Sequence, residues 1–197
     1  MVVATIAQML SFGGAFTIFT YLRPFLETQA QVNVPQLSLM LLSLGVAGFA
    51  GTYGASRLMQ RHFDALLIGL PVGLGVVSIG LLVVGNSFAG VAVMMFLWGT
   101  FHSAIPVSWS NWLTRRLRSD PEAGGGLMVG AIQVAIMLGG VFGGVLLDHL
   151  SITATFVGGI VLLTMAGMTM LRERRGGSLG DNTRQALAPA EGQPAEA

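Results

Sequence analysis

The sequence lacks cysteine altogether, which excludes a disulfide framework, a thiol nucleophile and thiolate metal sites. Charged residues are also scarce: they make up 10% of the 197 residues, whereas a soluble domain carries about a quarter. Hydrophobic residues reach 53%, and the formal net charge is only +1. This composition predicts a protein that lies in a lipid bilayer.

Long apolar runs account for that composition. A helix needs about 20 apolar residues to cross about 30 Å of hydrocarbon. Buried helices of a soluble protein would instead show polar faces at a helical period, and these runs do not. The runs free of Asp, Glu and Arg that meet this length are roughly 1–22, 35–56, 65–86, 88–114, 124–147 and 150–171. We therefore predict an all-α integral membrane protein whose six transmembrane helices form one domain over residues 1–172.

Arginine is distributed unevenly between the connections. The first, third and fifth connections hold one arginine, Arg23. The second and fourth connections, with the start of the tail, hold eight: Arg57, Arg61, Arg115, Arg116, Arg118, Arg172, Arg174 and Arg175. Because basic residues favour the cytoplasmic side, both termini are predicted to be cytoplasmic, in a cell inner membrane.

The two ends of the chain differ in character. Met1 opens directly into an apolar run with no basic residue before it. A secretory signal would need a charged n-region and a small-residue cleavage site, and this run is too long for one. We expect instead that the protein continues upstream. After Arg175 the chain is rich in Gly, Ala, Pro and polar residues, so residues 173–197 are expected to form a disordered cytoplasmic tail.

Six helices divide into two sets of three. Because three crossings bring the chain to the opposite side of the membrane, the second set is inverted relative to the first. Inverted repeats of this kind are found inside many secondary transporters. Glycines in the second and fifth helices support the match, because small residues let helix backbones approach closely. They are Gly45, Gly48, Gly51 and Gly54, and Gly139, Gly140, Gly143 and Gly144. Ordinary helix packing also explains these glycines.

Four segments resemble the major facilitator superfamily, specifically the C-terminal six-helix half of a drug/proton antiporter. They are "FTYLRPFLE" (19–27), "GTYGASRLMQRHFD" (51–64), "PVSWSNWLTRRL" (106–117) and "GGVFGGVLLDHL" (139–150). The last two are similar to bacterial purine ribonucleoside efflux pumps and to related sugar and drug exporters. The resemblance implies proton-coupled efflux of small organic solutes, with an inverted 3+3 repeat in this half.

Two departures from the family pattern concern function. The N-terminal six helices, with the antiporter signature and the usual acidic proton site, are absent from this sequence. The fifth helix reads "VAIMLGG" at 134–140, where the family often has an asparagine. The first departure concerns whether this chain can transport by itself. The second concerns which substrate it binds.

The fourth helix holds the richest candidate site. At 100° per residue, Trp98, His102, Ile105, Trp109 and Trp112 fall on one stripe, which suits a planar, weakly polar ligand such as a nucleobase. Pro106 has no N–H, so the carbonyl of His102 loses its helical partner near mid-membrane. An unperturbed histidine pKa near 6.5 suits a group that senses protonation. The alternatives are a histidine buried between helices and, for Trp112 above all, an interfacial tryptophan belt.

Other polar residues complete the candidate set. Gln8, Tyr21 and Gln133 are expected to face the cavity, although a residue of this kind, taken alone, more often forms an interhelical hydrogen bond. The resemblance implies a gating charge network at the cytoplasmic side. Separately, the helical spacing of two charged residues at the outer mouth of the first helix predicts a pair. The network residues are Arg57, Arg61 and Asp64, and the pair is Arg23 and Glu27, which also fits a surface ion pair.

These patterns predict transmembrane efflux of nucleoside-, sugar- or drug-like solutes by half of a twelve-helix transporter. The expected partners are a small-molecule substrate, the bilayer, and a missing N-terminal half or a second copy. We expect no cofactor, metal, nucleic acid or enzymatic activity, because the sequence has no metal cluster, nucleotide-binding loop or nucleophile–base set. The alternative is a non-transporting fragment of a truncated or mis-started transporter gene.

Overall fold

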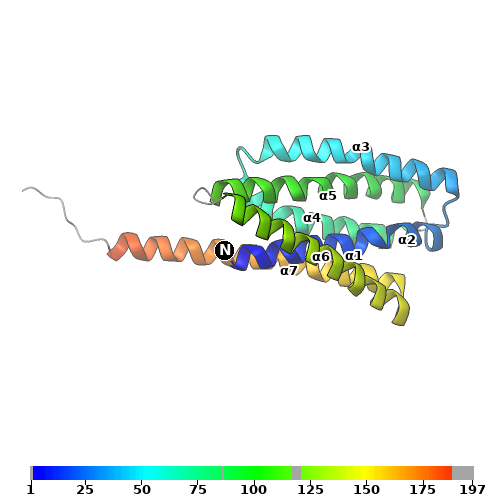
Figure 1. The fold of residues 1–197 in the computed structure, drawn as a ribbon. Coiled ribbons are helices and arrows are strands. Elements are labelled where there is room, and N and C mark those ends of the chain that lie inside the picture. Colours follow the sequence, from blue (N-terminus) through cyan, green and yellow to red (C-terminus); the bar gives the residue numbers. More distant parts are fainter. Residues whose placement is uncertain (1, 86, 117–120, 188–197) are drawn as a thin grey trace, which may run out of the picture.

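The computed structural model describes residues 2–85, 87–116 and 121–187, with side chains for 2–85, 87–114 and 125–174 (Figure 1). This part of the chain folds into helices without a strand. The helices are α1 (Val2–Thr20), α2 (Leu22–Thr28), α3 (Val34–Leu58), α4 (Phe63–Val83), α5 (Phe88–Arg116), α6 (Pro121–His149) and α7 (Ile152–Leu187).

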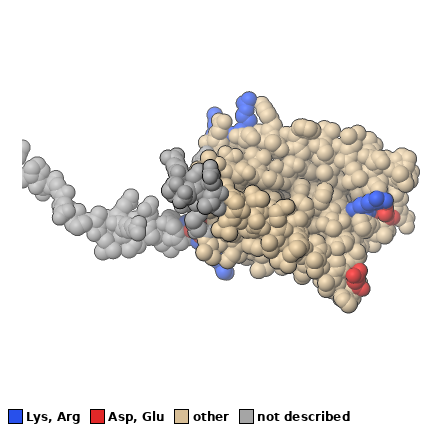
Figure 2. Space-filling view, in the orientation of Figure 1, with Lys and Arg blue, Asp and Glu red and all other residues tan. Residues whose placement is uncertain are grey.

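Six spans in the described residues are long and apolar enough to cross a membrane, as the sequence predicted. The first span, Val2–Thr28, joins α1 and α2. Many large apolar side chains point outward, and Phe49 is 82% exposed, which in water would be costly but suits lipid. Figure 2 shows charged side chains at the two ends of the bundle, with an uncharged surface between them.

Helix pairing shows the inverted repeat. α1 packs against α6 and α7, while α5 packs against α3 and α4. The first triplet is α1, α3 and α4, and the second is α5, α6 and α7. If each helix is replaced by its counterpart in the other triplet, the two contacts of α1 become the two contacts of α5. The pair of α4 with α7 is converted into itself, whereas α6 packs against α7 more extensively than α3 packs against α4. In Figure 1, α3 lies alongside α5 over its length. The predicted fold class is confirmed.

Glycines bring the paired helices together at equivalent crossings. A Cβ on Gly51 of α3 would overlap the backbone of Thr100 on α5, and one on Gly139 of α6 would overlap the backbone of Gly13 on α1. Side chains cannot stand between backbones this close, so only glycine fits. In contrast, Gly45 has no neighbour there within 4 Å. The glycines of the second and fifth helices therefore serve packing at some positions and not at others.

The first span continues past the predicted end at residue 22. Pro24 lies in the first turn of α2, where a backbone N–H has no partner within the helix, so proline is tolerated. The next span begins with a capping box: Asn33 Oδ1 accepts from Gln36 N at 3.0 Å, and Gln36 Oε1 accepts from Asn33 N at 3.0 Å. The remaining spans begin and end within a few residues of their predicted limits.

The C-terminal boundary differs from the prediction. Residues 173–187 were expected to be disordered, but α7 continues to Leu187. A helix that is already nucleated adds one hydrogen bond for each further residue, so it can extend without an apolar face. Residues 188–197 of the predicted tail lie outside the described residues.

Candidate functional site

Four aromatic side chains gather where the inner faces of α1 and α5 meet; we call them the aromatic quartet. Its members are Phe16 and Phe19 of α1 and Trp98 and His102 of α5. The His102 ring lies 4.6 Å from the Trp98 ring and 5.3 Å from the Phe19 ring, stacked with both. Phe16 meets His102 edge-on at 5.5 Å. The quartet thus joins the two helices that the inverted repeat makes equivalent.

His102 combines burial with an unmet hydrogen-bonding group. It lies near the middle of the span Phe88–Thr114. Its Nδ1 atom is buried and has no hydrogen-bond partner among the described residues. Leaving a buried polar group without a partner costs about 1–3 kcal/mol, so the site favours a molecule that supplies one. The ring neighbours Phe16, Phe19 and Trp98 carry no charge.

The tryptophans of α5 turn inward. Trp98 is fully buried, and its Nε1 donates to Ser78 Oγ of α4 at 3.1 Å, which fixes the plane of the ring. Trp109 and Trp112 meet edge-to-face at 5.9 Å, two helical turns or more beyond His102. Trp112 is 7% exposed, so its ring packs inside the bundle rather than against lipid.

Pro106 does not interrupt α5. The helix runs from Phe88 to Arg116 with Pro106 inside it and exposed on its surface. Proline still removes the N–H that would bond the carbonyl of His102, and a membrane helix tolerates this where the rest of the ladder is intact. The carbonyl next to the quartet is therefore without its usual helical donor.

The other predicted cavity residues lie in three different settings. Tyr21 donates its hydroxyl to the carbonyl of Gly140 at 2.9 Å, and Thr17 donates to that of Gly139 at 2.9 Å, so both tie α1 to α6. Gln8 is 1% exposed, and its Nε2 has no partner among the described residues. Gln133 is exposed on α6. Tyr21 thus forms an interhelical hydrogen bond, the alternative kept for it.

The predicted charge network is only partly assembled. Arg61 and Asp64 line one hollow of about 330 Å³, which Arg174 of α7 also lines. Arg57 does not line it: its guanidinium lies 5.1 Å from the centre of the Tyr53 ring, a cation–π arrangement. Sequence reasoning used Arg174 only for orientation, because nothing local indicates that the end of α7 meets the start of α4.

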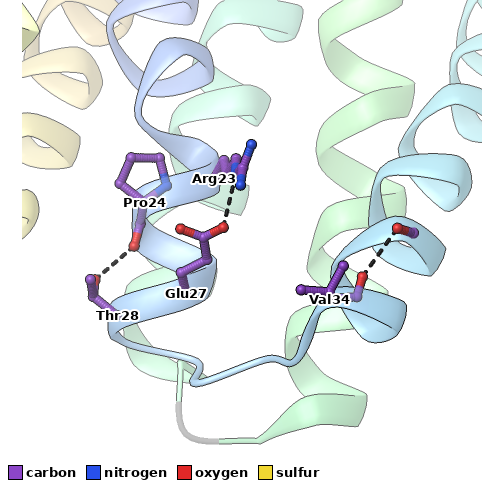
Figure 3. Close-up of polar contacts among 6 residues, drawn as sticks. Arg23, Pro24, Glu27, Thr28 and Val34 are labelled. Carbon is purple, nitrogen blue, oxygen red and sulfur yellow. Dashed lines mark hydrogen bonds and ion pairs between the residues drawn. The ribbon is translucent and has the colours of Figure 1, made fainter.

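Arg23 and Glu27 form the predicted pair at the opposite end, where their Nε and Oε1 atoms lie 2.8 Å apart (Figure 3). The side chains are 70% and 44% exposed. Such a surface pair stabilises by about 0–1 kcal/mol. Thr28 Oγ1 donates to the carbonyl of Pro24 at 2.7 Å, which helps to close this short helix.

Sequence reasoning missed Phe16, Phe19 and Ser78. A signal for the two phenylalanines was present, since residues three apart share a helix face and the first and fourth helices are equivalent in the repeat. Ser78 offered none, because a serine in an apolar span bonds its own helix as readily as a neighbour; its Oγ also donates to the carbonyl of Leu74 at 2.8 Å.

Six apolar spans in two inverted triplets define a multi-pass membrane protein built like half of a transporter. Residues 4–194 match the family model of the Major Facilitator Superfamily, and the chain belongs to this family. The resemblance stated from the four sequence segments is thus confirmed.

The chain is also similar to individual proteins of known name. The chain is 41% identical over 170 residues to the Transcription regulatory protein OpdE of Pseudomonas aeruginosa, an alignment that covers 86% of the chain and 42% of that protein. It is 37% identical over 161 residues to the Purine ribonucleoside efflux pump NepI of Salmonella paratyphi B and of Salmonella typhimurium, covering 81% of the chain and 41% of each relative. The chain therefore spans about two-fifths of the length of the curated relatives it matches.

Proposed function

We propose that this chain forms the second half of an efflux transporter for small planar solutes of nucleoside type, working by proton antiport. The aromatic quartet would hold the planar part of the solute. The observation that carries this assignment is the buried Nδ1 of His102, which has no partner among the described residues and lies beside stacked rings. Similarity to the pump NepI supports the choice of solute class.

The quartet also reaches the surface of this half. Phe19 is 39% exposed, and His102 is partly exposed. A planar ring would therefore stack against the quartet from outside the bundle, and it would give His102 its missing hydrogen bond once the side chains that bury Nδ1 move aside. Because such a site has only one wall here, transport needs a second wall, from an N-terminal half or from a second copy of the chain.

Gln133 of α6 supports a surface of this half that does not face lipid. It is exposed within the span Gly125–His149, where an amide facing lipid would lose its hydrogen bonds. A position against the partner half or the solute pathway avoids that cost. Alternating access would then arise from the two halves rocking, with no covalent chemistry and no cofactor. Both termini would lie in the cytoplasm, and the membrane would be the cell inner membrane.

The test joins this chain to the N-terminal half of a matched pump and measures export of a radiolabelled purine ribonucleoside. His102→Leu removes the hydrogen-bonding ring, and KM should rise about five- to tenfold, the equivalent of one hydrogen bond. His102→Gln keeps hydrogen bonding but cannot titrate, so export should persist with a flatter pH dependence. His149→Gln is the matched control, since this histidine is exposed at the end of α6.

Three results would separate the possibilities. If His102→Leu exports with unchanged KM and pH profile, His102 is a packing residue and the site assignment fails. The unjoined chain should insert into membranes without exporting. Proton-dependent export by the purified chain in liposomes would instead indicate a homodimer, and no export even from the joined protein would favour a non-transporting fragment.

A further inference from the structure

A second hollow lies far from the quartet, between the α3–α4 connection and the end of α7. Its volume is about 330 Å³. The residues that decide its chemistry are polar: Gln60, Arg61, His62 and Asp64 from the connection and the first turn of α4, and Arg174 from α7. In the sequence these two segments are more than a hundred residues apart, so only the fold brings them together.

Positive charge outweighs negative charge in this hollow. Arg61 and Arg174 line it from two separate helices, against the single carboxylate of Asp64. Among the side chains that the structure describes, the one ion pair is Arg23–Glu27 at the opposite end, so neither lining arginine is neutralised. Two unpaired arginines that line one hollow are suited to an anion with several oxygens, because each guanidinium group offers a planar set of N–H donors.

The start of α4 adds to this potential. Its N-cap residue is His62, whose side chain makes no capping hydrogen bond and which also lines the hollow. The N-terminus of a 21-residue helix carries a partial positive charge that favours anions. Asp64 in the first turn already uses part of this effect, so its carboxylate would compete with an incoming anion.

The position of the hollow relative to the membrane indicates the source of the anion. The apolar spans around the hollow end here: α4 begins at Phe63, and the last span ends at Arg174. The hollow therefore lies at the level of lipid headgroups, where basic pockets between transmembrane helices hold phosphate groups.

We propose that this hollow binds a phosphate anion, carried by a lipid headgroup or by a free phosphate ester. The site shares no residue with the quartet and lies at the end of the bundle rather than at its middle, but Arg61 and Asp64 also belong to the predicted gating network. The site ties the end of α7 to the start of α4 through one bridging ligand.

Binding is measured on the purified 197-residue chain in detergent, by native mass spectrometry with phosphatidylglycerol and, separately, by calorimetry with inorganic phosphate. Arg61→Gln and Arg174→Gln should each weaken binding about fivefold, the value of one surface arginine near a phosphate. Asp64→Asn should strengthen it. Arg57→Gln is the control, because it removes the same charge at the same end from a side chain that faces Tyr53 instead.

The two binding measurements distinguish a lipid source from a soluble source of the phosphate and can also overturn the proposal. Binding of phosphatidylglycerol with this order of variants supports a lipid source, and the same order with inorganic phosphate supports a soluble one. The proposal is overturned if neither probe binds, or if Arg57→Gln weakens binding as much as Arg61→Gln. Should a glutamine variant unfold, Arg61→Lys keeps the charge but loses the planar donor set, so it should still bind phosphate, more weakly than the unsubstituted chain; a complete loss of binding would overturn the proposal.

Discussion

Replacing Gly99 of α5 with alanine tests how closely α3 and α5 approach each other. A Cβ there would stand 2.5 Å from the carbonyl oxygen of Leu44 and 3.1 Å from its carbonyl carbon. Ordinary contacts begin at 3.4 Å, so α3 would have to move by nearly an ångström. The neighbour is backbone and cannot rotate away. Overpacking of this kind costs about 1–3 kcal/mol, at the upper end here, and the better helix propensity of alanine offsets about 1 kcal/mol.

The expected net loss is therefore about 2 kcal/mol, which lowers the melting temperature by about 4–8 °C for a domain of this size. Tryptophan fluorescence of the purified chain in detergent follows the transition, since all three tryptophans are buried. Gly45→Ala is the matched control: it makes the same chemical change on the facing helix, where nothing lies within 4 Å. Its melting temperature should stay the same or rise.

Equal melting temperatures for the Gly99 and Gly45 variants would refute the reasoning. That result would mean that α3 and α5 are not in backbone contact at this crossing. The inverted repeat would then lose its packing basis in this half, because the crossing of α1 and α6 was assigned by the same argument.

Further predictions concern orientation and two polar contacts. Reporters fused within 115–123 should report the cytoplasm and those within 27–35 the outside, as the arginine distribution requires; an outside report from 115–123 would reverse the orientation. Tyr21→Phe removes the hydrogen bond to α6 and should destabilise the chain by about 0.6 kcal/mol in a melting assay, whereas Tyr53→Phe, on an exposed ring, should have no effect. Glu27→Gln breaks an exposed ion pair, so its melting temperature should fall by no more than about 4 °C, and a larger fall would show a buried role.

Much of the fold could be predicted from the sequence because lipid imposes a simple rule. Every backbone polar group must be satisfied within its own segment, so an apolar run of sufficient length becomes a helix. The charged residues mark where the runs end, and the count of six fixes the inverted arrangement of the two triplets. The same rule does not act beyond the membrane, which is why the extension of α7 to Leu187 was missed.

The candidate site could be predicted only in part. The helical period placed Trp98 and His102 on one face of the fourth helix, and the structure stacks their rings. That period says nothing about which neighbour the face meets. Phe19 and Ser78 come from other helices, and the inward turn of Trp98 toward Ser78 depends on that neighbour.

The sequence by itself determined the spans, the arginine-rich end and the family, because each depends on composition and local order along the chain. Tertiary structure alone decided which apolar faces meet, since helices that are apolar all round carry no amphipathic direction. Close backbone approach at Gly51 and Gly139 selects the partners. Those partners then bring Phe19 to His102 and Arg174 to Arg61. Both candidate sites depend on contacts between residues far apart in the chain, and such contacts follow from shape rather than from pattern.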